Sequence, residues 1–358
     1  MQYKYSDIFK WSSGKPVEST NGEVPVYGSN GIVGYSDVAK YENKIILGRV
    51  GAYCGSVEYC EGKFNATDNT LITTCNETLI EYKYAYYMLK IAQLNDYAGG
   101  AAQPLITQGI LKHLTCDIPD IPTQKKIASI LSTYDDLIEK NNRKIAILRE
   151  MAEEIYKEWF VRFRFPGYKT AKFKDGIPEG WKVKRCSAIS SIKAGGDAPK
   201  EYSAARTDKF IYPIYSNGIS NDGLYGYTDK ATIKTESVTI SARGTVGFVC
   251  LRTEPYLPIV RLLSIVPNTE FISNIYLYMY LKHNTTDGYG TSQQQITVPY
   301  FKKKKILLPK QDIMFKYTKL VEPLFNGIKK LKLANENLTQ QRDLLLPRLM
   351  SGKLEVKA

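Results

Sequence analysis

The chain has 358 residues, of which 43% are hydrophobic, and its 49 lysines and arginines against 36 acidic residues give a net charge of +13. This length exceeds what a single hydrophobic core usually supports, so we expect at least two domains. No apolar run reaches the ~18 residues that a membrane span needs, and the N-terminal residues lack a signal-peptide core, so we expect a cytoplasmic protein. The basic excess favours a polyanionic partner such as nucleic acid without specifying one.

Residues 1–121 are predicted to form one domain of short strands. Glycine- and asparagine-rich turns separate runs that favour strands, which are expected near residues 44–47 and 71–74. One helix is expected over residues 81–94, where tyrosine, methionine and leucine recur at helical spacing. The first region is therefore a mixed domain in which strands predominate.

Residues 122–165 follow a different period and are predicted to form a long helix and a linker. From Ile127 to Trp159, apolar residues recur at steps of three and four, with one extra residue at Asn141. A helix of about 35 residues spans roughly 50 Å. Because so narrow a stripe buries little surface by itself, this helix needs a partner.

Residues 166–308 repeat the first domain, with strands expected near residues 237–241 and 261–266 and a helix near 274–282. Five landmarks recur in the same order about 190 residues later, a period far longer than the roughly 20 to 50 residues of a solenoid repeat. The matched pairs are Tyr27 with Tyr215, Arg49 with Arg243, Tyr86 with Tyr278, Ile106 with Ile296 and Gln124 with Gln311. Duplication of a whole domain favours a ligand that is itself long and two-part.

Residues 309–358 contain the counterpart of the first long helix. Apolar residues recur at steps of three and four from Met314 to Leu345, and Pro323 is expected to kink this helix or to start it afresh. The two long helices either pack each on its own domain or pair antiparallel, and their length favours pairing. Asn141 and Asn335, on the two apolar seams, either fix the register of such a pair or face solvent.

The predicted fold class is α+β. It consists of two similar mixed, strand-rich domains separated by two long antiparallel coiled-coil-like helices, with a pseudo-twofold internal repeat. The expected divisions are a first domain over residues 1–121, a central helix and linker over 122–165, a second domain over 166–308 and a C-terminal helix over 309–358.

Residues typical of catalysis are isolated from one another. His113 and His283 each lie far from a candidate nucleophile, and the six cysteines include no Cys-x-x-Cys pair. The chain contains neither a phosphate-binding Gly-x-x-x-x-Gly-Lys-Ser/Thr loop nor a dinucleotide-binding Gly-x-Gly-x-x-Gly motif. We therefore expect no catalytic residue, no metal site and no cofactor bound by this chain.

Donors and aromatic residues do gather at the predicted turns, where side chains can reach a DNA groove. Amide and arginine side chains pair with base edges, whereas lysines are better suited to phosphates. The candidate DNA contacts are Tyr27, Ser29, Asn30, Arg49, Gln103, Gln108, Tyr215, Ser216, Asn217, Arg243, Ser292, Gln293, Gln294, Gln295, Lys302 and Lys303. Residues shared by both copies are more typical of the common fold, so specificity is expected where the copies differ, for example at residues 293–295 against residues 103–105.

Three motifs make the chain resemble the specificity subunit of type I restriction-modification systems. Residues 151–167 (MAEEIYKEWFVRFRFPG) resemble that family's central conserved region, and residues 344–354 (LLLPRLMSGKL) its C-terminal one. Residues 178–181 (PEGW) resemble the opening of its target-recognition domains, and residues 100–107 and 290–297 resemble the element that closes them. Two departures are the absence of that opening in the first copy and Arg342 on the C-terminal seam, where an apolar residue is expected.

The resemblance implies two target-recognition domains, each reading one half of a split, asymmetric site in double-stranded DNA, with the helices acting as a ruler. It also implies two modification subunits, which bring S-adenosylmethionine and adenine methylation, and motor-nuclease restriction subunits, which use ATP and magnesium. The implied setting is the prokaryotic cytoplasm, with no membrane partner. The methylase-docking candidates are Trp159, Phe160, Arg162, Phe163 and Arg164, although the aromatics among them equally suit burial against the second domain.

Two other functions are weighed against this one. The first is a diverged stand-alone DNA methyltransferase or nuclease, which the missing cofactor and metal motifs disfavour. The second is a scaffold without a DNA role, which the basic charge and the duplicated domain disfavour.

Overall fold

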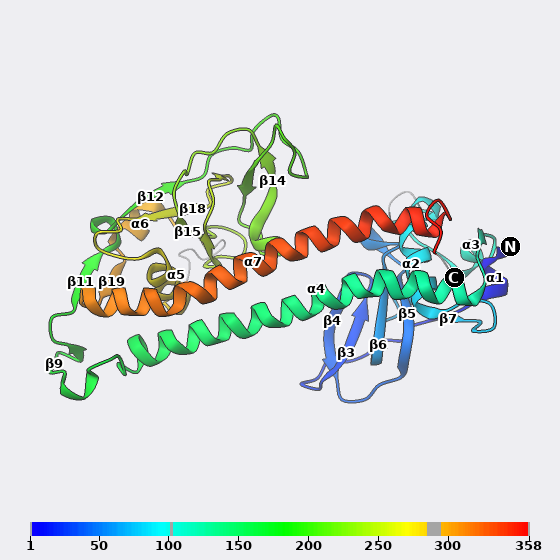
Figure 1. The fold of residues 1–358 in the computed structure, drawn as a ribbon, viewed down its shortest axis with the longest axis horizontal. Coiled ribbons are helices and arrows are strands. Elements are labelled where there is room, and N and C mark those ends of the chain that lie inside the picture. The colour runs from blue at the N-terminus through cyan, green and yellow to red at the C-terminus, as the bar shows by residue number, and fades with distance from the viewer. Residues whose placement is uncertain (1, 101–102, 285–294, 357–358) are drawn as a thin grey trace. The chain divides into compact units, whose positions relative to one another are not determined.

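A computed structural model describes residues 2–100, 103–284 and 295–356 (Figure 1). The chain divides into two compact units: unit 1 comprises Met1–Arg143 with Leu331–Ala358, and unit 2 comprises Lys144–Lys330. Each unit contains one strand-rich domain and one end of each of two long helices, α4 (Ile121–Tyr156) and α7 (Gln311–Met350). The predicted α+β class, with two similar domains and two long helices, is confirmed.

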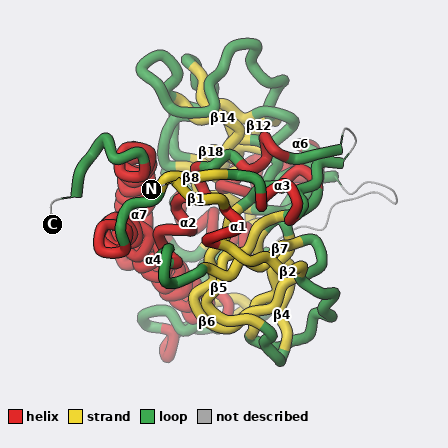
Figure 2. The backbone as a smooth tube through the Cα atoms, turned by 90° about the vertical axis from the view of Figure 1, so that its right-hand side faces the viewer, coloured by secondary structure: helices red, strands yellow, loops and turns green. Residues whose placement is uncertain are grey.

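The domain of unit 1 is built on a six-stranded sheet with the order β2-β7-β5-β6-β3-β4 (Figure 2). The helix α2 packs on β5 and β6, and β1 pairs antiparallel with β8. Fully buried residues of the strands and of α2, including Ile45, Leu47, Leu71 and Tyr84, form the core. The elements are β1 (Gln2–Lys4), α1 (Tyr5–Ile8), β2 (Phe9–Ser13), β3 (Val24–Gly28), β4 (Gly31–Ser36), β5 (Tyr41–Gly48), η1 (Gly51–Tyr53), β6 (Val57–Ala66), β7 (Thr70–Cys75), α2 (Tyr82–Ile91), η2 (Leu94–Tyr97), α3 (Gln108–Lys112) and β8 (Thr115–Asp117).

The domain of unit 2 repeats this arrangement as two sheets, with the orders β12-β18-β15-β16 and β14-β13-β17. Its elements are η3 (Lys157–Val161), η4 (Tyr168–Thr170), β9 (Phe173–Lys174), β10 (Ile177–Pro178), β11 (Lys182–Arg185), η5 (Cys186–Ala188), β12 (Ser190–Ala194), β13 (Tyr212–Tyr215), η6 (Ser220–Gly223), β14 (Leu224–Thr228), β15 (Ser237–Ile240), β16 (Val249–Arg252), β17 (Leu257–Pro258), β18 (Leu263–Pro267), α5 (Asn274–His283), α6 (Val298–Lys303) and β19 (Lys305–Leu308). The strands and helices expected from sequence in both domains are therefore present, with ends shifted by a few residues.

One difference between the copies has a clear local cause. In unit 1 the single long strand β6 pairs with β5 and continues in parallel with β3, joining the sheet into one. In unit 2 the corresponding strand is divided into β16 and β17, and Pro255 lies between them. Proline has no N–H to donate to a neighbouring strand, so the ladder is interrupted and the sheet separates into two.

The helix α7 runs without a break through Pro323, so the expectation that it would start afresh there is wrong. Pro323 is exposed, and the carbonyl four residues earlier, which loses its N–H partner, can be hydrated instead. On either side, Val321 and Ile328 are buried, and Val321 belongs to the hydrophobic core of unit 2. Tertiary packing thus outweighs the local preference of proline.

None of the helices in the described part of the chain is long and apolar enough to cross a membrane.

Within each unit the two helix segments pair in opposite directions, as predicted. In unit 1 the Asn141 amide donates to Asn335 Oδ1 at 2.8 Å, and the Asn335 amide donates to Asn142 Oδ1 at 2.9 Å. In unit 2, Tyr156 of α4 lies edge-on to Tyr317 of α7. The two seam asparagines therefore meet each other, which agrees with a role in fixing the register.

Arg342 is accommodated on the seam of unit 1 by acidic partners. It pairs with Asp135 and Asp343, and Asp135 also accepts a hydrogen bond from Tyr87 Oη. Burial lowers the pKa of the guanidinium, but the bonds to the two carboxylates outweigh it and raise the pKa. A polar cluster of α2, α4 and α7 thus replaces the apolar contact expected at this position.

Candidate nucleic-acid interface

The first candidate contacts lie at the short turn between β3 and β4. Tyr27 is half-buried and lies edge-on to Phe64 at 5.7 Å, and burial raises the pKa of its phenol. Ser29 Oγ donates to the Asn69 carbonyl at 2.6 Å, while Asn30 is exposed. Of these three residues, Asn30 presents the side chain that is most free to reach a ligand.

The corresponding residues of unit 2 are more involved in their own fold. The Asn217 amide donates to the Val260 carbonyl at 2.6 Å, and its oxygen accepts from Ala242 N–H at 2.8 Å. Ser216 Oγ donates to the Gly223 carbonyl at 3.4 Å. Asn217 thus ties the β13–β14 connection to neighbouring loops, and Ser216 closes the connection on itself. A direct DNA contact from Asn217 would require its bonds to be exchanged.

The two arginine landmarks are not equivalent in the structure, and their pairing in the sequence comparison is wrong. Ile106 N–H donates to the Arg49 carbonyl, and the matching bond in unit 2 runs from Ile296 N–H to Ala242. Arg49 therefore corresponds to Ala242, and Arg243 is one residue further along. Adjacent residues of an extended chain face opposite sides, so the two guanidinium groups occupy different surroundings.

Their contacts differ accordingly. The Nε atom of Arg49 is buried and has no hydrogen-bond partner among the described residues. Arg243 is exposed, and its Nε donates to Gln295 Oε1 at 3.1 Å. Because the arginines are not shared by the copies, they become candidates for reading different half-sites.

The remaining candidates lie near the end of each domain. Gln103 is exposed, Gln108 is half-buried at the start of α3, and Lys302 and Lys303 are exposed in the last turn of α6. Gln295 is held by Arg243 as described. Ser292, Gln293 and Gln294 lie outside the described residues. The DNA contacts of all these residues stay predictions.

One surface of unit 2 escaped the sequence comparison. On β14, Tyr225 is exposed and packs on Tyr202 at 5.2 Å, and Arg206 lies over the ring of Tyr227 at 5.2 Å. Val33 of β4 is the counterpart of Tyr225, because each is the extra residue at the bulge of its strand, Val33 between Ile32 and Gly34 and Tyr225 between Leu224 and Gly226. The two domains therefore share one strand arrangement and expose different side chains at the same position. The longer loop that brings Tyr202 and Arg206 was the available signal, because its counterpart in unit 1 is shorter.

The methylase-docking candidates divide into aromatic residues that are buried or half-buried and arginines that are exposed. Phe160 is 6% exposed and belongs to the core of unit 2, where Trp159 and Phe163 pack against it. Burial, the alternative left open by the sequence, is thus what the structure gives for Phe160. Arg162 and Arg164 are exposed, and both pair with Glu158.

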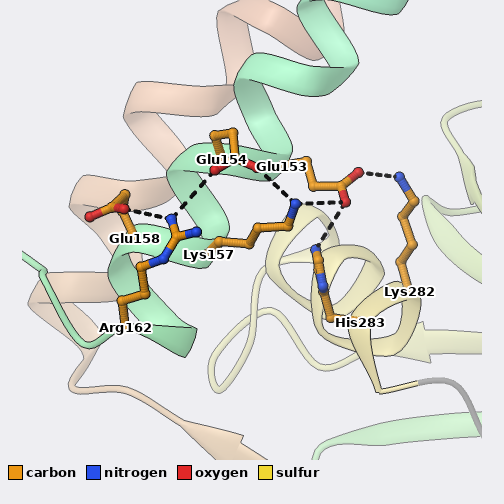
Figure 3. Close-up of polar contacts among 7 residues, drawn as sticks. All are labelled: Glu153, Glu154, Lys157, Glu158, Arg162, Lys282 and His283. Carbon is orange, nitrogen blue, oxygen red and sulfur yellow. Dashed lines mark hydrogen bonds and ion pairs between the residues drawn. The ribbon is translucent and has the colours of Figure 1, made fainter.

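A charged cluster joins α4 to the end of α5 within unit 2 (Figure 3). Glu153 accepts a hydrogen bond from Lys282 at 2.7 Å and lies 3.4 Å from Lys157 and 3.6 Å from His283 Nε2. The bond from Lys282 is the main cause that lowers the pKa of Glu153, and burial opposes it. Burial lowers the pKa of His283, with Lys157 and Lys282 adding to the effect and Glu153 opposing it.

We expect Glu153→Gln to destabilise unit 2 by about 1 to 2 kcal/mol at pH 7, because it removes a charge-assisted hydrogen bond. A carboxyl whose pKa is lowered by folding stabilises the protein above its unfolded pKa and loses this contribution as the pH falls through the folded value. The difference between wild type and variant should therefore be full at pH 7 and shrink as the pH falls below about 4. Urea unfolding followed by the fluorescence of Trp159 and Trp181 measures it.

Glu154→Gln is the matched control, because Glu154 lies on the same helical turn but is more exposed and contacts no residue of α5. Its substitution should have little effect at any pH. An equal loss in both variants, or a loss in Glu153→Gln that persists at pH 3, would contradict the assignment.

No group of three or more histidine, cysteine or acidic residues suited to a metal ion occurs in the part of the chain that the structure describes. All six cysteines are free, and five are buried. The exposed features are instead loops with aromatic, amide and basic side chains, which suit recognition of a surface.

Comparison with known proteins identifies the relatives of this arrangement. The family model described as "Type I restriction modification DNA specificity domain" matches residues 1–149 and again residues 178–338. A putative type I specificity subunit from Mycoplasma pneumoniae is 24% identical over 335 residues, covering 90% of this chain and 88% of that protein. The specificity subunit of the type I restriction enzyme MjaIX from Methanocaldococcus jannaschii is 28% identical over 306 residues, covering 77% of this chain and 69% of that protein.

A solved structure has the same fold. The crystal structure of a type I restriction-modification system S subunit from M. genitalium superposes with a TM-score of 0.63 at 18% identity, covering 98% of this chain and 95% of that one. The two matched segments of the family model each contain one of the strand-rich domains, so the internal repeat is also a repeat of the family's unit.

Proposed function

Since this chain belongs to the type I restriction-modification DNA specificity family, we propose that its two domains each read one half of a bipartite, asymmetric DNA site. The observation that carries this proposal is the repeat with different exposed side chains. At equivalent positions the first domain exposes Val33 and the second exposes Tyr225, and the two arginines also differ in place. The backbone fold shared by the two domains suits the common geometry of duplex DNA. Their different exposed side chains suit half-sites of different base sequence.

In this proposal the two long helices set the spacer. Half-sites read from one face of a duplex lie about one turn, roughly 34 Å, apart, and helices of this length can span such a distance. Arg243 and Gln103, which are exposed, would contact base edges, while Lys302 and Lys303 would contact phosphates. Because the DNA of a prokaryote lies in its cytoplasm, the protein would act there.

The helices would also dock two modification subunits. Ile130 on α4 and Leu320 on α7 are exposed apolar residues, 37% and 49% accessible, in unit 1 and unit 2 respectively. The two residues are equivalent in position. Ile130 lies six residues after Gln124, which bonds the N-terminus of α2, and Leu320 lies six residues after Met314, which bonds the N-terminus of α5. An exposed apolar residue at the same position in each unit supports the binding of two copies of one partner. Arg162 and Arg164 would add to the docking surface of unit 2.

The chemistry would belong to those partners. We propose that this chain is not itself an enzyme and binds no cofactor, and that the modification subunits supply S-adenosylmethionine. Restriction subunits would supply ATP- and magnesium-dependent translocation and cleavage. The alternative, a diverged stand-alone methyltransferase or nuclease, predicts that the purified chain binds S-adenosylmethionine or acts on DNA without a partner.

Methylation mapping tests the proposal. The chain is co-expressed with its modification subunit in a host free of adenine methylation, and modified adenines are read across the genome. We expect one bipartite asymmetric motif with a fixed spacer. Replacing residues 166–308 with the second domain of a relative should change one half of the motif and leave the other half and the spacer unchanged.

Three results would oppose the proposal. A soluble, assembled complex with an active modification subunit that produces no new motif would contradict a role in recognition. Methylation by this chain alone would make it an enzyme. A motif without two separated halves would contradict the assignment of one half-site to each domain.

A further inference from the structure

A buried arginine lies beneath the connection between the paired strands β13 and β14 of the second domain. Arg252, the last residue of β16, is 5% exposed. Its Nε donates to Thr239 Oγ1 at 2.9 Å, and its Nη2 donates to the Asp222 carbonyl at 2.7 Å. Its guanidinium carbon lies 3.6 Å from the centre of the Tyr215 ring. The side chain thus joins the sheet to the β13–β14 connection.

The segment that Arg252 holds has a backbone that needs support. Asn221 and Asp222 both adopt left-handed conformations, with φ of 49° and 55°. Asparagine and aspartate tolerate this region better than other residues except glycine, but two consecutive left-handed residues are uncommon and persist where the surroundings fix them. A hydrogen bond from a buried guanidinium to the Asp222 carbonyl fixes this peptide in place, while Asn221 beside it stays exposed.

The first domain lacks this device. Arg252 pairs with Ser237 at the end of the β15–β16 ladder, and Cys60 pairs with Lys44 at the same place in the β5–β6 ladder of unit 1. Cys60 is therefore the counterpart of Arg252. There the cysteine meets Tyr27, the counterpart of Tyr215, and the β3–β4 turn consists of Ser29 and Asn30 alone. A short turn needs no internal support, whereas residues 216–223 form a longer connection. The buried arginine and the longer connection therefore occur together in one copy.

We propose that Arg252 is a positioning residue for DNA specificity: it holds the β13–β14 connection in the one conformation that reads the half-site of the second domain. The inference rests on the proposed function, since it takes that domain to be the reader of one half-site. Arg252 itself is buried and does not contact DNA. Loss of its bonds would let residues 219–222 sample several conformations, so that the connection accepts more than one base sequence.

The test compares methylation of cognate and mismatched sites by assembled complexes of the full-length chain with its modification subunit. Arg252→Met removes both donors and the charge while retaining much of the volume. Arg252→Lys retains the charge and can make one of the two bonds, so an intermediate effect is expected. Arg185→Met is the matched control, because Arg185 is exposed on β11 of the same domain.

For Arg252→Met we expect the ratio of methylation at cognate sites to that at single-mismatch sites to fall about tenfold in one half-site only, the half that changes when residues 166–308 are replaced. The other half-site is an internal control and should be unchanged. Equal loss of methylation at all sites, with both half-sites read as before, would show that Arg252 only supports the fold and would overturn the inference.

The remaining outcomes are also decisive. If Arg252→Met fails to assemble, Arg252→Lys carries the test, and retention of full discrimination by the lysine variant would overturn the inference. If the wild-type complex yields no bipartite motif, the proposed function fails rather than the role of Arg252. An equal relaxation in Arg185→Met would overturn a specific role for the buried arginine.

Discussion

Phe160→Ala is expected to lower the free energy of unfolding of unit 2 by about 3 to 5 kcal/mol, the usual loss when a buried aromatic side chain is truncated. Phe160 lies in the short π-helix that follows α4, and its ring centre is 4.8 Å from those of both Tyr276 and Tyr317 and 5.9 Å from that of Trp181. These partners come from α5, α7 and the segment before β11. One side chain therefore joins the central helix, the C-terminal helix and the domain.

Urea unfolding followed by the fluorescence of Trp159 and Trp181 measures this loss. Val161→Ala is the control: Val161 follows Phe160 directly but is exposed, so its truncation should change stability by no more than about 0.5 kcal/mol. If Phe160 served instead as a docking contact, Phe160→Ala would leave unfolding unchanged and weaken only the binding of the modification subunit. That result would contradict the packing seen here.

Gln124→Met is expected to destabilise unit 1 by about 2 to 4 kcal/mol, because it leaves buried backbone groups without partners. Gln124 is 0% exposed at the start of α4. Its oxygen accepts from Glu81 N–H at 2.8 Å, and its amide donates to the carbonyls of Leu79 and Pro119, each at 2.9 Å. Glu81 in turn caps α2. The three bonds fix where the long helix meets the first domain.

The second domain shows why methionine is an instructive replacement. There Ser273, which caps α5, directs its N–H to Met314 Sδ at 3.3 Å. Met314 is thus the counterpart of Gln124, and the landmark that matched Gln124 with Gln311 is wrong. Gln311→Met is the control, since Gln311 is exposed and its amide donates to the Glu270 carbonyl. We expect it to change the unfolding free energy by less than about 1 kcal/mol. Equal effects of the two substitutions would contradict the assignment of Met314, rather than Gln311, as the counterpart of Gln124.

Much of the architecture was predictable from sequence because it rests on periodicity. Steps of three and four residues place apolar side chains on one helical face, so α4 and α7 were found with nearly correct ends. Landmarks about 190 residues apart revealed the duplicated domain, since a repeat needs only matching order. The polar seam residues Asn141 and Asn335 were also identified, and they meet in the structure.

The details of the candidate site were less predictable. A shift of one residue in an extended segment reverses the face of a side chain, which is why Arg49 and Arg243 were matched wrongly. Phe160 and the exposed Arg162 lie in the same motif, and only the arrangement of α5 and α7 around it decides which is buried. The continuity of α7 through Pro323 likewise depends on packing by residues remote from it in sequence.

The sequence by itself determined the family, the two strand-rich domains and the two long helices, because motifs, turns and periods are local properties of the chain. Only the tertiary structure decided which side chains those elements bring together. It matched Gln124 with Met314 and Arg49 with Ala242, and it placed Arg252 beneath the β13–β14 connection. Such pairings depend on register and burial between segments far apart in sequence, which no local pattern encodes.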